Sequence, residues 1–297
     1  MENSSTTFAR KPRVLFCSYH SYIDPGSGAA LSTRDLLEWL ARHGWHCRVF
    51  SGAEFDGAEG GALPALLAAQ QVPYDVQHGH AGSLPFALYH FTQGGVPVAV
   101  YQAPDVQPGR TPTPAEGQTF LTLFERMLDA FRPDVLLTFG GHWFAPIFMQ
   151  RARQRGVRVV FCLKNCNYHS AELFRETDAV LVLSEYCREH YRRTLGLECT
   201  VLPSLIDETR VRSPSVQGRY VTFVNPLPHK GAAVFARIAH ELGRRRPDIP
   251  LLVVESRAKA TALQAAKLDF GGRTNLFVME QTPDPRDFSE SDLMAPE

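Results

Sequence analysis

Hydrophobic runs of strand length alternate with amphipathic stretches of helix length along almost the whole chain. The first run, residues 14–17, is apolar without a break, as a strand buried on both faces of a sheet requires. Leucines at helical spacing follow it and stop at Gly44, and residues 47–50 form the next run. Repeated strand–helix–strand units of this kind predict an α/β fold, with a parallel sheet covered by helices.

The alternation also predicts how the chain is divided into domains. Residues 13–204 carry one complete set of units, and residues 219–297 begin a second set. The polar segment 205–218 lacks strong periodicity and is interpreted as a linker between the two. Residues 1–12 are expected to be a disordered lead-in.

Two local motifs within the first domain are well defined. Strand-like runs flank Gln93 and the two glycines that follow it, which predicts a β-hairpin inserted at residues 86–101. Further along, Thr113 is placed to cap a helix, with Pro114 at its first position and Glu116 completing a capping box. We therefore expect a long helix to begin at this point.

The second domain shows fewer strand–helix pairs than the first. Strand patterns cover residues 220–224, 251–254 and 276–279, and a fourth is expected to begin at residues 292–294. Doubly wound domains generally continue through more pairs, so the second domain is predicted to be incomplete. Its helix patterns cover residues 231–246 and 258–268, and the first is expected to turn inward Val234, Ile238, Ala239 and Leu242.

Charge and composition restrict the classes of partner. Lys and Arg number 31, as do Asp and Glu, so no overall field favours nucleic acid or an anionic membrane. No apolar run reaches the ~18 residues that span a bilayer, which leaves only peripheral membrane contact open. The six cysteines are scattered and no apolar leader is visible, so we expect reduced thiols in the cytoplasm.

Two segments of the first domain that follow strands could carry chemistry. Gly26 and Gly28 let the backbone approach a phosphate or a sugar closely, although turns use glycine for steric reasons at least as often. His142, after Gly140 and Gly141, could face a cleft as an acid–base or hydrogen-bonding group. It could equally be a histidine that forms only local hydrogen bonds at a helix start.

Two further candidates follow strands of the second domain. Lys230 stands where a helix begins, a position already favourable for phosphate, and the alternative is a solvated lysine on a surface helix. Glu255 ends a strand and could bind ribose or sugar hydroxyls, but a strand-end charge in solvent is the commoner case.

Several other classes of site are disfavoured. His78 and His80 would share one face of a strand, but no third metal ligand can be read from the sequence. The chain contains no Walker A loop, no G-x-S-x-G elbow and no G-x-G-x-x-G fingerprint. P-loop, serine hydrolase and ordinary dinucleotide-binding interpretations are therefore disfavoured.

Five landmarks occur in an order that resembles glycosyltransferase family 4, which has the two-Rossmann-domain (GT-B) fold. They are residues 13–18 with the glycine loop and Gly44, residues 132–135 leading to His142, residues 177–180 leading to Ser184, residues 201–207, and residues 223–231 ending in Lys-Gly. The resemblance covers nearly all of residues 13–297. It implies a glycosyltransferase with an N-terminal acceptor domain and a C-terminal donor domain that is cut short.

The resemblance also implies roles for individual residues. Gly26 and Gly28 would lie against the donor diphosphate or the acceptor, and His142 would face the transferred sugar in a cleft between the domains. Lys230 would bind the diphosphate, while the nucleotide base would lie against Met279 and Glu280. Such enzymes usually retain the anomeric configuration and need no tightly held metal or other cofactor. The acceptor, a sugar, a lipid or a small molecule, is not identified.

Two departures from the family pattern keep alternatives open. Asn225 occupies the position, five residues before Lys230, where the family commonly has arginine, so it can donate hydrogen bonds but no charge. The family's pair of glutamates would follow the last residue, so we expect little transferase activity from this chain as given. The alternatives are a non-catalytic or inactive nucleotide-sugar-binding relative, and a nucleotide-sugar epimerase with the GT-B fold.

Overall fold

The structure is a computed structural model that describes residues 10–56, 63–105, 109–208, 212, 219–266 and 275–280. It forms two compact units, Met1–Leu205 and Ile206–Glu297. None of the helices in the described ranges has the length and apolar character that crossing a bilayer requires. The fourth strand expected at residues 292–294 lies outside these ranges, as do most of the expected lead-in and linker.

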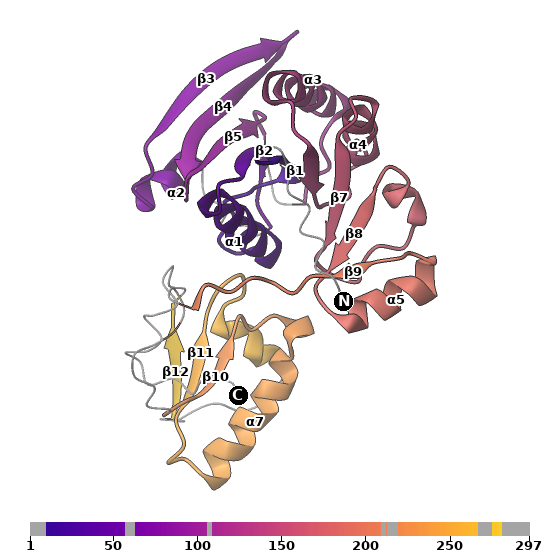
Figure 1. Ribbon diagram of the computed structural model, residues 1–297. Coiled ribbons are helices and arrows are strands. Elements are labelled where there is room, and N and C mark those ends of the chain that lie inside the picture. The colour runs from indigo at the N-terminus through magenta and orange to yellow at the C-terminus, as the bar shows by residue number, and fades with distance from the viewer. Residues whose placement is uncertain are drawn as a thin grey trace. The chain divides into compact units, whose positions relative to one another are not determined.

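The first unit is a nine-stranded sheet with helices on both faces (Figure 1). Its strands are β1 (Arg13–His20), β2 (His46–Glu54), β3 (Tyr74–Ala81), β4 (Leu84–Gln93), β5 (Val96–Gln102), β6 (Val135–Thr138), β7 (Arg158–Leu163), β8 (Ala179–Val182) and β9 (Thr200–Val201). Its helices are α1 (Gly28–Arg42), α2 (Leu63–Ala69), α3 (Pro114–Phe131), α4 (Ala145–Gln154), the 3-10 helix η1 (Ala171–Phe174) and α5 (Glu185–Leu195).

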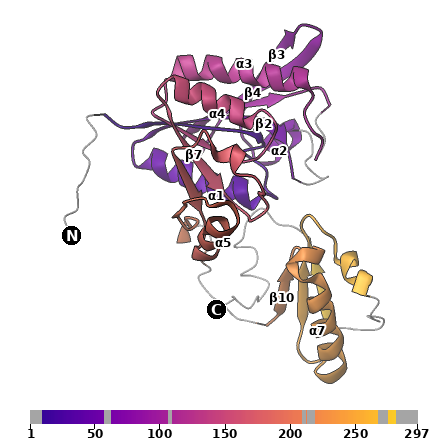
Figure 2. The same ribbon diagram turned by 90° about the vertical axis from the view of Figure 1, so that its right-hand side faces the viewer.

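Each face of this sheet buries its own apolar cluster. Successive residues of β1 alternate between them, so Leu15 packs with the α3 and α4 side while Phe16 packs with the α1 side. Figure 2 shows α3 and α4 on one side of the sheet and α1 on the other. The predicted α/β architecture is therefore present, with helices covering both faces of the strands.

The order of the strands places a topological switch point at the centre of the sheet. The order is β3-β4-β5-β2-β1-β6-β7-β8-β9, with every pair from β5 to β9 parallel. From β1 the chain crosses to β2 through α1 on one face, and from β6 it crosses to β7 through α4 on the other. In open α/β sheets such a switch point is where ligands bind, beyond the carboxyl ends of the strands.

Two local predictions from the sequence are confirmed. Thr113 Oγ1 accepts a hydrogen bond from the Glu116 amide at 3.3 Å, and a Glu116 carboxylate oxygen accepts one from the Thr113 amide at 2.7 Å. The capping box thus begins α3 as expected. β4 and β5 pair antiparallel across Gly94 and Gly95, whose φ angles of 54° and 80° suit the tight turn of a hairpin.

The second unit contains a parallel sheet in the order β10-β11-β12 within the described residues. Its elements are β10 (Val221–Val224), the 3-10 helix η2 (Pro228–Lys230), α7 (Ala232–Arg245), β11 (Leu251–Val254), the 3-10 helix η3 (Ala260–Ala266) and β12 (Leu276–Met279). α7 packs on β10 and β11 through Phe235 and Ala239. The carboxyl ends of the three strands lie along one edge, because all of them run in the same direction.

Several details of the sequence interpretation are wrong. Val234 and Ile238 are 63% and 43% exposed, because α7 turns Phe235 and Ala236 toward the sheet instead. The segment expected as a helix at residues 258–268 is the 3-10 helix η3 where it is described. β3 and α2 were not expected at all, and β1 and β2 run on beyond the short apolar runs that predicted them.

Candidate functional site

Three neighbouring strands carry polar side chains to the switch point. His20 is the last residue of β1, Glu54 is the last residue of β2, and His142 follows the end of β6. His20 and Glu54 are opposite each other in the pairing register, beyond an irregularity that begins at Ser18. Because the three strands are parallel neighbours in the order β2-β1-β6, their carboxyl ends bring these side chains together.

The glycines before His142 let its loop pass close to β1. Gly140 has a φ of +96°, which side chains rarely tolerate. A Cβ at this position would lie 2.7 Å from Cδ2 of His20, closer than such atoms approach. Ser18 Oγ also donates a hydrogen bond to the Phe139 carbonyl at 2.9 Å, which ties β1 to the end of β6. The Gly-Gly-His sequence is therefore a packing requirement of this switch point.

Glu54 holds the cluster together. Its Oε2 atom lies 2.6 Å from Nε2 of His142 and 3.3 Å from Nδ1 of His20. Only the contact with His142 has the direction of a hydrogen bond, and His20 Nδ1 has no hydrogen-bond partner among the described residues. The Glu54 side chain is 6% exposed and that of His142 is 15% exposed. A carboxylate buried so deeply depends on the hydrogen bond with His142 for compensation.

Aromatic rings surround His142 on several sides. Tyr19 meets it edge-on with ring centroids 5.1 Å apart, and Phe144 stacks on it at 5.8 Å. The His20 ring lies at 4.8 Å. These contacts fix the orientation of the imidazole and lower the local dielectric constant, so that its hydrogen bond with Glu54 is strengthened.

Burial controls the protonation of the groups around the cluster. Burial is the largest effect on His20 and lowers its pKa, although the charge of Glu54 opposes the shift. His20 is therefore held in its neutral form at neutral pH. Burial also raises the pKa of the Tyr19 hydroxyl, so that this group stays protonated.

The remaining nitrogen of His142 has no partner within the cluster. Nδ1 forms no hydrogen bond within the described part of the chain, and it is not among the fully buried polar atoms. A carboxylate beside Nε2 favours the tautomer that carries the proton there, which leaves Nδ1 as an acceptor. The arrangement can therefore accept a proton or a hydrogen bond from a hydroxyl group at the switch point.

The same three side chains could also hold a metal ion. His20, Glu54 and His142 each offer a ligand atom, and these atoms all lie within 4.8 Å of one another. Ligands around tetrahedral zinc are about 3.3 Å apart, given bond lengths of about 2.0–2.1 Å. The separation of 2.6 Å between Glu54 and His142 is that of a hydrogen bond. His78 and His80 lie exposed on β3 and belong to no such group in the described ranges.

Of the glycines predicted to meet a phosphate, one already uses its amide. The Gly26 amide donates to Asp24 Oδ1 at 2.8 Å, and the buried Asp24 also accepts from the Asp56 amide. Gly28 is the first residue of α1, which has no side-chain cap, so its amide has no acceptor in its own helix. A Cβ on Gly28 would meet nothing within 4 Å, so the backbone is open here.

In the second unit, Lys230 and Asn225 differ sharply in exposure. Lys230 is exposed at the end of η2, beside Gly231, whose φ of +93° begins α7 without a side-chain cap. Asn225 is 7% exposed, has a φ of +58°, and its Oδ1 atom has no partner within the described residues. Lys230 is thus open to solvent at the helix start, whereas Asn225 lies inside the loop.

The other predicted residues of this unit follow β11 and β12. Glu255 is engaged locally, since its carboxylate accepts from the Ala260 amide at 2.7 Å and lies 3.4 Å from Lys259 Nζ. Its own amide donates to the Met279 carbonyl. Glu280 is exposed at the end of β12. These residues share the carboxyl edge of the sheet, but Glu255 also caps the start of η3.

His20 and Glu54 were missed by the sequence interpretation. Both lie beyond the short apolar runs that predicted β1 and β2, where polar Ser18 and Ser51 interrupt the pattern. Both serines are nevertheless buried, at 1% and 0% exposure. Strands in globular proteins are usually 3–10 residues long. Extending the two predicted strands to ordinary lengths would have placed His20 and Glu54 at their ends.

The comparisons with known proteins concern the family and the fold. Residues 27–203 match the protein family described as "Glycosyl transferase 4-like domain". No curated protein sequence matches the chain.

Solved structures share the fold at low identity. The catalytic domain of starch synthase IV from Arabidopsis thaliana, bound to ADP and acarbose, has a TM-score of 0.61 at 10% identity, covering 96% of this chain and 77% of that one. UDP-GlcNAc 2-epimerase from Neisseria meningitidis, bound to UDP-GlcNAc, has a TM-score of 0.53 at 10% identity, covering 95% of this chain and 76% of that one. α,α-Trehalose 6-phosphate synthase from Burkholderia multivorans has a TM-score of 0.50 at 10% identity, covering 93% of this chain and 74% of that one. These likenesses confirm an α/β fold of the GT-B kind.

Proposed function

We propose, since this chain belongs to the glycosyl transferase 4-like domain family, that it transfers a sugar from a nucleotide-sugar donor to an acceptor. The observation that carries this proposal is the hydrogen bond between Glu54 and His142 at the switch point of the first sheet. It lies in the matched region, at the place in an α/β sheet where ligands bind. The histidine retains one nitrogen available to a sugar hydroxyl.

The donor is assigned to the second unit. Lys230 and the uncapped first amides of α7 would stabilise the departing diphosphate, because positive charge and helix-end dipoles favour the developing anion. Asn225 and Glu255 would hold phosphate and ribose, and the base would lie against Met279 and Glu280. Within the first unit, Gly28 would offer its amide to a phosphate or a sugar, with Gly26 shaping the loop.

His142 is assigned to the transferred sugar. Held by Glu54 in one tautomer, it would accept a proton or a hydrogen bond from a sugar or acceptor hydroxyl through Nδ1. Retention of the anomeric configuration belongs to the same proposal, by analogy with glycosyltransferase family 4. The proposed acceptor is a sugar, a lipid or a small molecule, reached in the cytoplasm or at a membrane surface. The six free cysteines suit a reducing compartment.

Two experiments test the function together. A thermal-shift screen of common nucleotide sugars is expected to find one that raises the melting temperature, because a ligand that binds only the folded state stabilises it. Product analysis with the labelled form of that donor then separates the candidate reactions. Transfer or hydrolysis of the sugar supports the proposal. If none of the nucleotide sugars in the screen binds, the proposal is contradicted.

An epimerase is the second candidate, because the GT-B fold of this chain also occurs in the Neisseria meningitidis epimerase. In the labelled-donor experiment an epimerase would return an intact nucleotide sugar with inverted configuration at one ring carbon. A binding module without activity would return the donor unchanged. Either product would replace glycosyl transfer as the function of this site.

We expect the reaction to proceed without a tightly held metal. His142 and Glu54 are close enough to hydrogen-bond directly, so the cluster needs no ion to hold its geometry. Dialysis against EDTA is therefore expected to leave donor affinity and donor turnover unchanged. Loss of turnover that zinc or manganese restores would contradict this and would assign the ion to His20, Glu54 and His142.

A further inference from the structure

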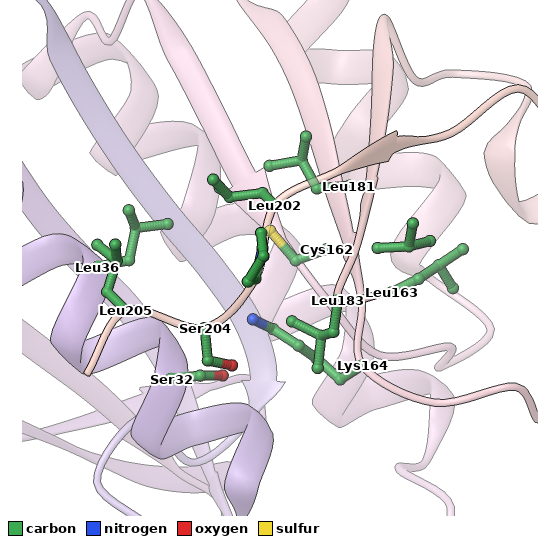
Figure 3. Close-up of a pocket in the computed structure, with 12 residues that line it drawn as sticks. Ser32, Leu36, Cys162, Leu163, Lys164, Leu181, Leu183, Leu202, Ser204 and Leu205 are labelled. Carbon is green, nitrogen blue, oxygen red and sulfur yellow. The ribbon is translucent and has the colours of Figure 1, made fainter. Parts of the chain in front are cut away.

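A small pocket lies at the carboxyl ends of β7 and β8 in the first unit (Figure 3). It lies between α1, the two strand ends and the segment after β9, and its free space of about 340 Å³ includes open solvent. Leucines make up half of its lining residues, and Lys164, Ser32 and Ser204 supply its polar groups. The enclosed part is small, so that at most a single group of a larger molecule could enter it.

Lys164 brings a positive charge into this pocket without a counter-charge. Within the described residues its ammonium forms no hydrogen bond and no ion pair, and burial lowers its pKa. Cys162 is the other titratable residue of the pocket wall, and burial raises the pKa of its thiol to about 11. The thiol is therefore neutral at neutral pH and does not compensate the lysine. A half-buried cation in leucine surroundings attracts an anion more strongly than one in water.

The two serines add hydroxyl groups on the same side as the ammonium, as Figure 3 shows. Ser204 is exposed and forms no hydrogen bond within the described part of the chain. Ser32 donates to the carbonyls of Gly28 and Ala29 within α1, a local bond that a hydroxyl gives up at little cost. Both can therefore donate to an anionic oxygen.

We propose that this pocket binds an anionic group, a phosphate or a carboxylate, carried by the acceptor, with Lys164 as its counter-charge. The assignment to the acceptor rests on the proposed function and on the place of the pocket. Lys164 directly follows β7, at the same carboxyl edge of the sheet as the cluster of His20, Glu54 and His142. The acceptor is accordingly an acidic molecule rather than a neutral sugar.

Titration with inorganic phosphate and with acetate, at constant ionic strength, tests the pocket itself. The change is Lys164→Met, which keeps an unbranched side chain as far as Cε and removes the charged ammonium. Affinity for these anions is expected to fall about tenfold, because the charge-assisted hydrogen bond is lost. Lys11→Met is the matched control, since Lys11 is exposed and bonds only the His43 carbonyl among the described residues. Equal affinity in parent and Lys164→Met, or no anion binding by the parent, would overturn the proposal.

Titration with UDP separates an acceptor anion from the donor's phosphates. Lys164→Met is expected to bind UDP as the parent does, and UDP is expected not to displace phosphate from the pocket. Weaker UDP binding by Lys164→Met would assign the pocket to the donor and overturn the acceptor assignment. If phosphate binding depends on Lys164 but the chain binds no nucleotide sugar, the anion site is supported and the glycosyltransferase function is refuted. If the chain binds a nucleotide-sugar donor but no anion at Lys164, the function is supported and the anion site is refuted.

Discussion

His142→Gln is expected to lower turnover at least about a hundredfold while the protein remains folded, because proton transfer by a positioned side chain contributes ~10²–10⁴ to rate. Glutamine keeps an N–H group that can donate to Glu54, which satisfies the buried carboxylate. It lacks a basic nitrogen in the place of Nδ1. The measurement is the rate of sugar transfer and donor hydrolysis for parent and variant, together with their melting temperatures.

His142→Ala is the informative companion to this variant. Alanine leaves the carboxylate of Glu54, 6% exposed, with only His20 beside it. An unsatisfied buried group costs about 1–3 kcal/mol, so His142→Ala should melt lower than His142→Gln. Normal turnover by His142→Gln would show that the histidine only fills space.

Where a pattern is local, the sequence predicted the structure well. The capping box of Thr113 and Glu116 depends on residues three apart, and the hairpin turn depends on two glycines that tolerate positive φ. The position of His142 after β6 follows from the length of an apolar strand. Such features need no knowledge of what the element packs against, so they can be read from a single chain.

Where burial depends on distant partners, the sequence misled. Ser18 is polar, yet it lies inside β1 because its hydroxyl bonds the Phe139 carbonyl, 121 residues away. The apolar pattern therefore ended early and hid His20. On α7, Val234 and Phe235 are both apolar, and only contact with Phe223 and the sheet decides which one faces inward. No local rule contains that choice.

For the candidate site too, some features could be predicted from the sequence and others could not. Strand ends could be located from the sequence, which is why His142, Lys230 and Glu255 were proposed. The hydrogen-bond partner of each side chain could not be predicted. For example, the Glu255 carboxylate accepts a hydrogen bond from the Ala260 amide. Likewise, the Gly26 amide is bound by Asp24, a residue that carried no role in the sequence analysis. Hydrogen bonds of this kind depend on how the loops close after folding.

Lys230→Ala is expected to weaken binding of the nucleotide-sugar donor by ten- to a hundredfold, since a hydrogen bond to a charged group contributes about 1.5–3 kcal/mol. Lys230 is exposed and forms no ion pair within the described residues, so alanine leaves no buried group unsatisfied and should not alter folding. It precedes α7, whose first amides have no side-chain cap. These amides and the lysine would share the diphosphate. Isothermal titration calorimetry with the donor and with UDP measures the loss.

Arg244→Ala provides the control for charge alone. Arg244 lies in the last turn of the same helix, is 58% exposed and pairs with Glu241. Its removal lowers the net charge as much as Lys230→Ala does, but at the helix end where the dipole repels phosphate. Donor affinity should therefore be unchanged in Arg244→Ala. If the two variants bind the donor equally well, the helix start does not hold the diphosphate, and the donor must be bound by residues other than Lys230.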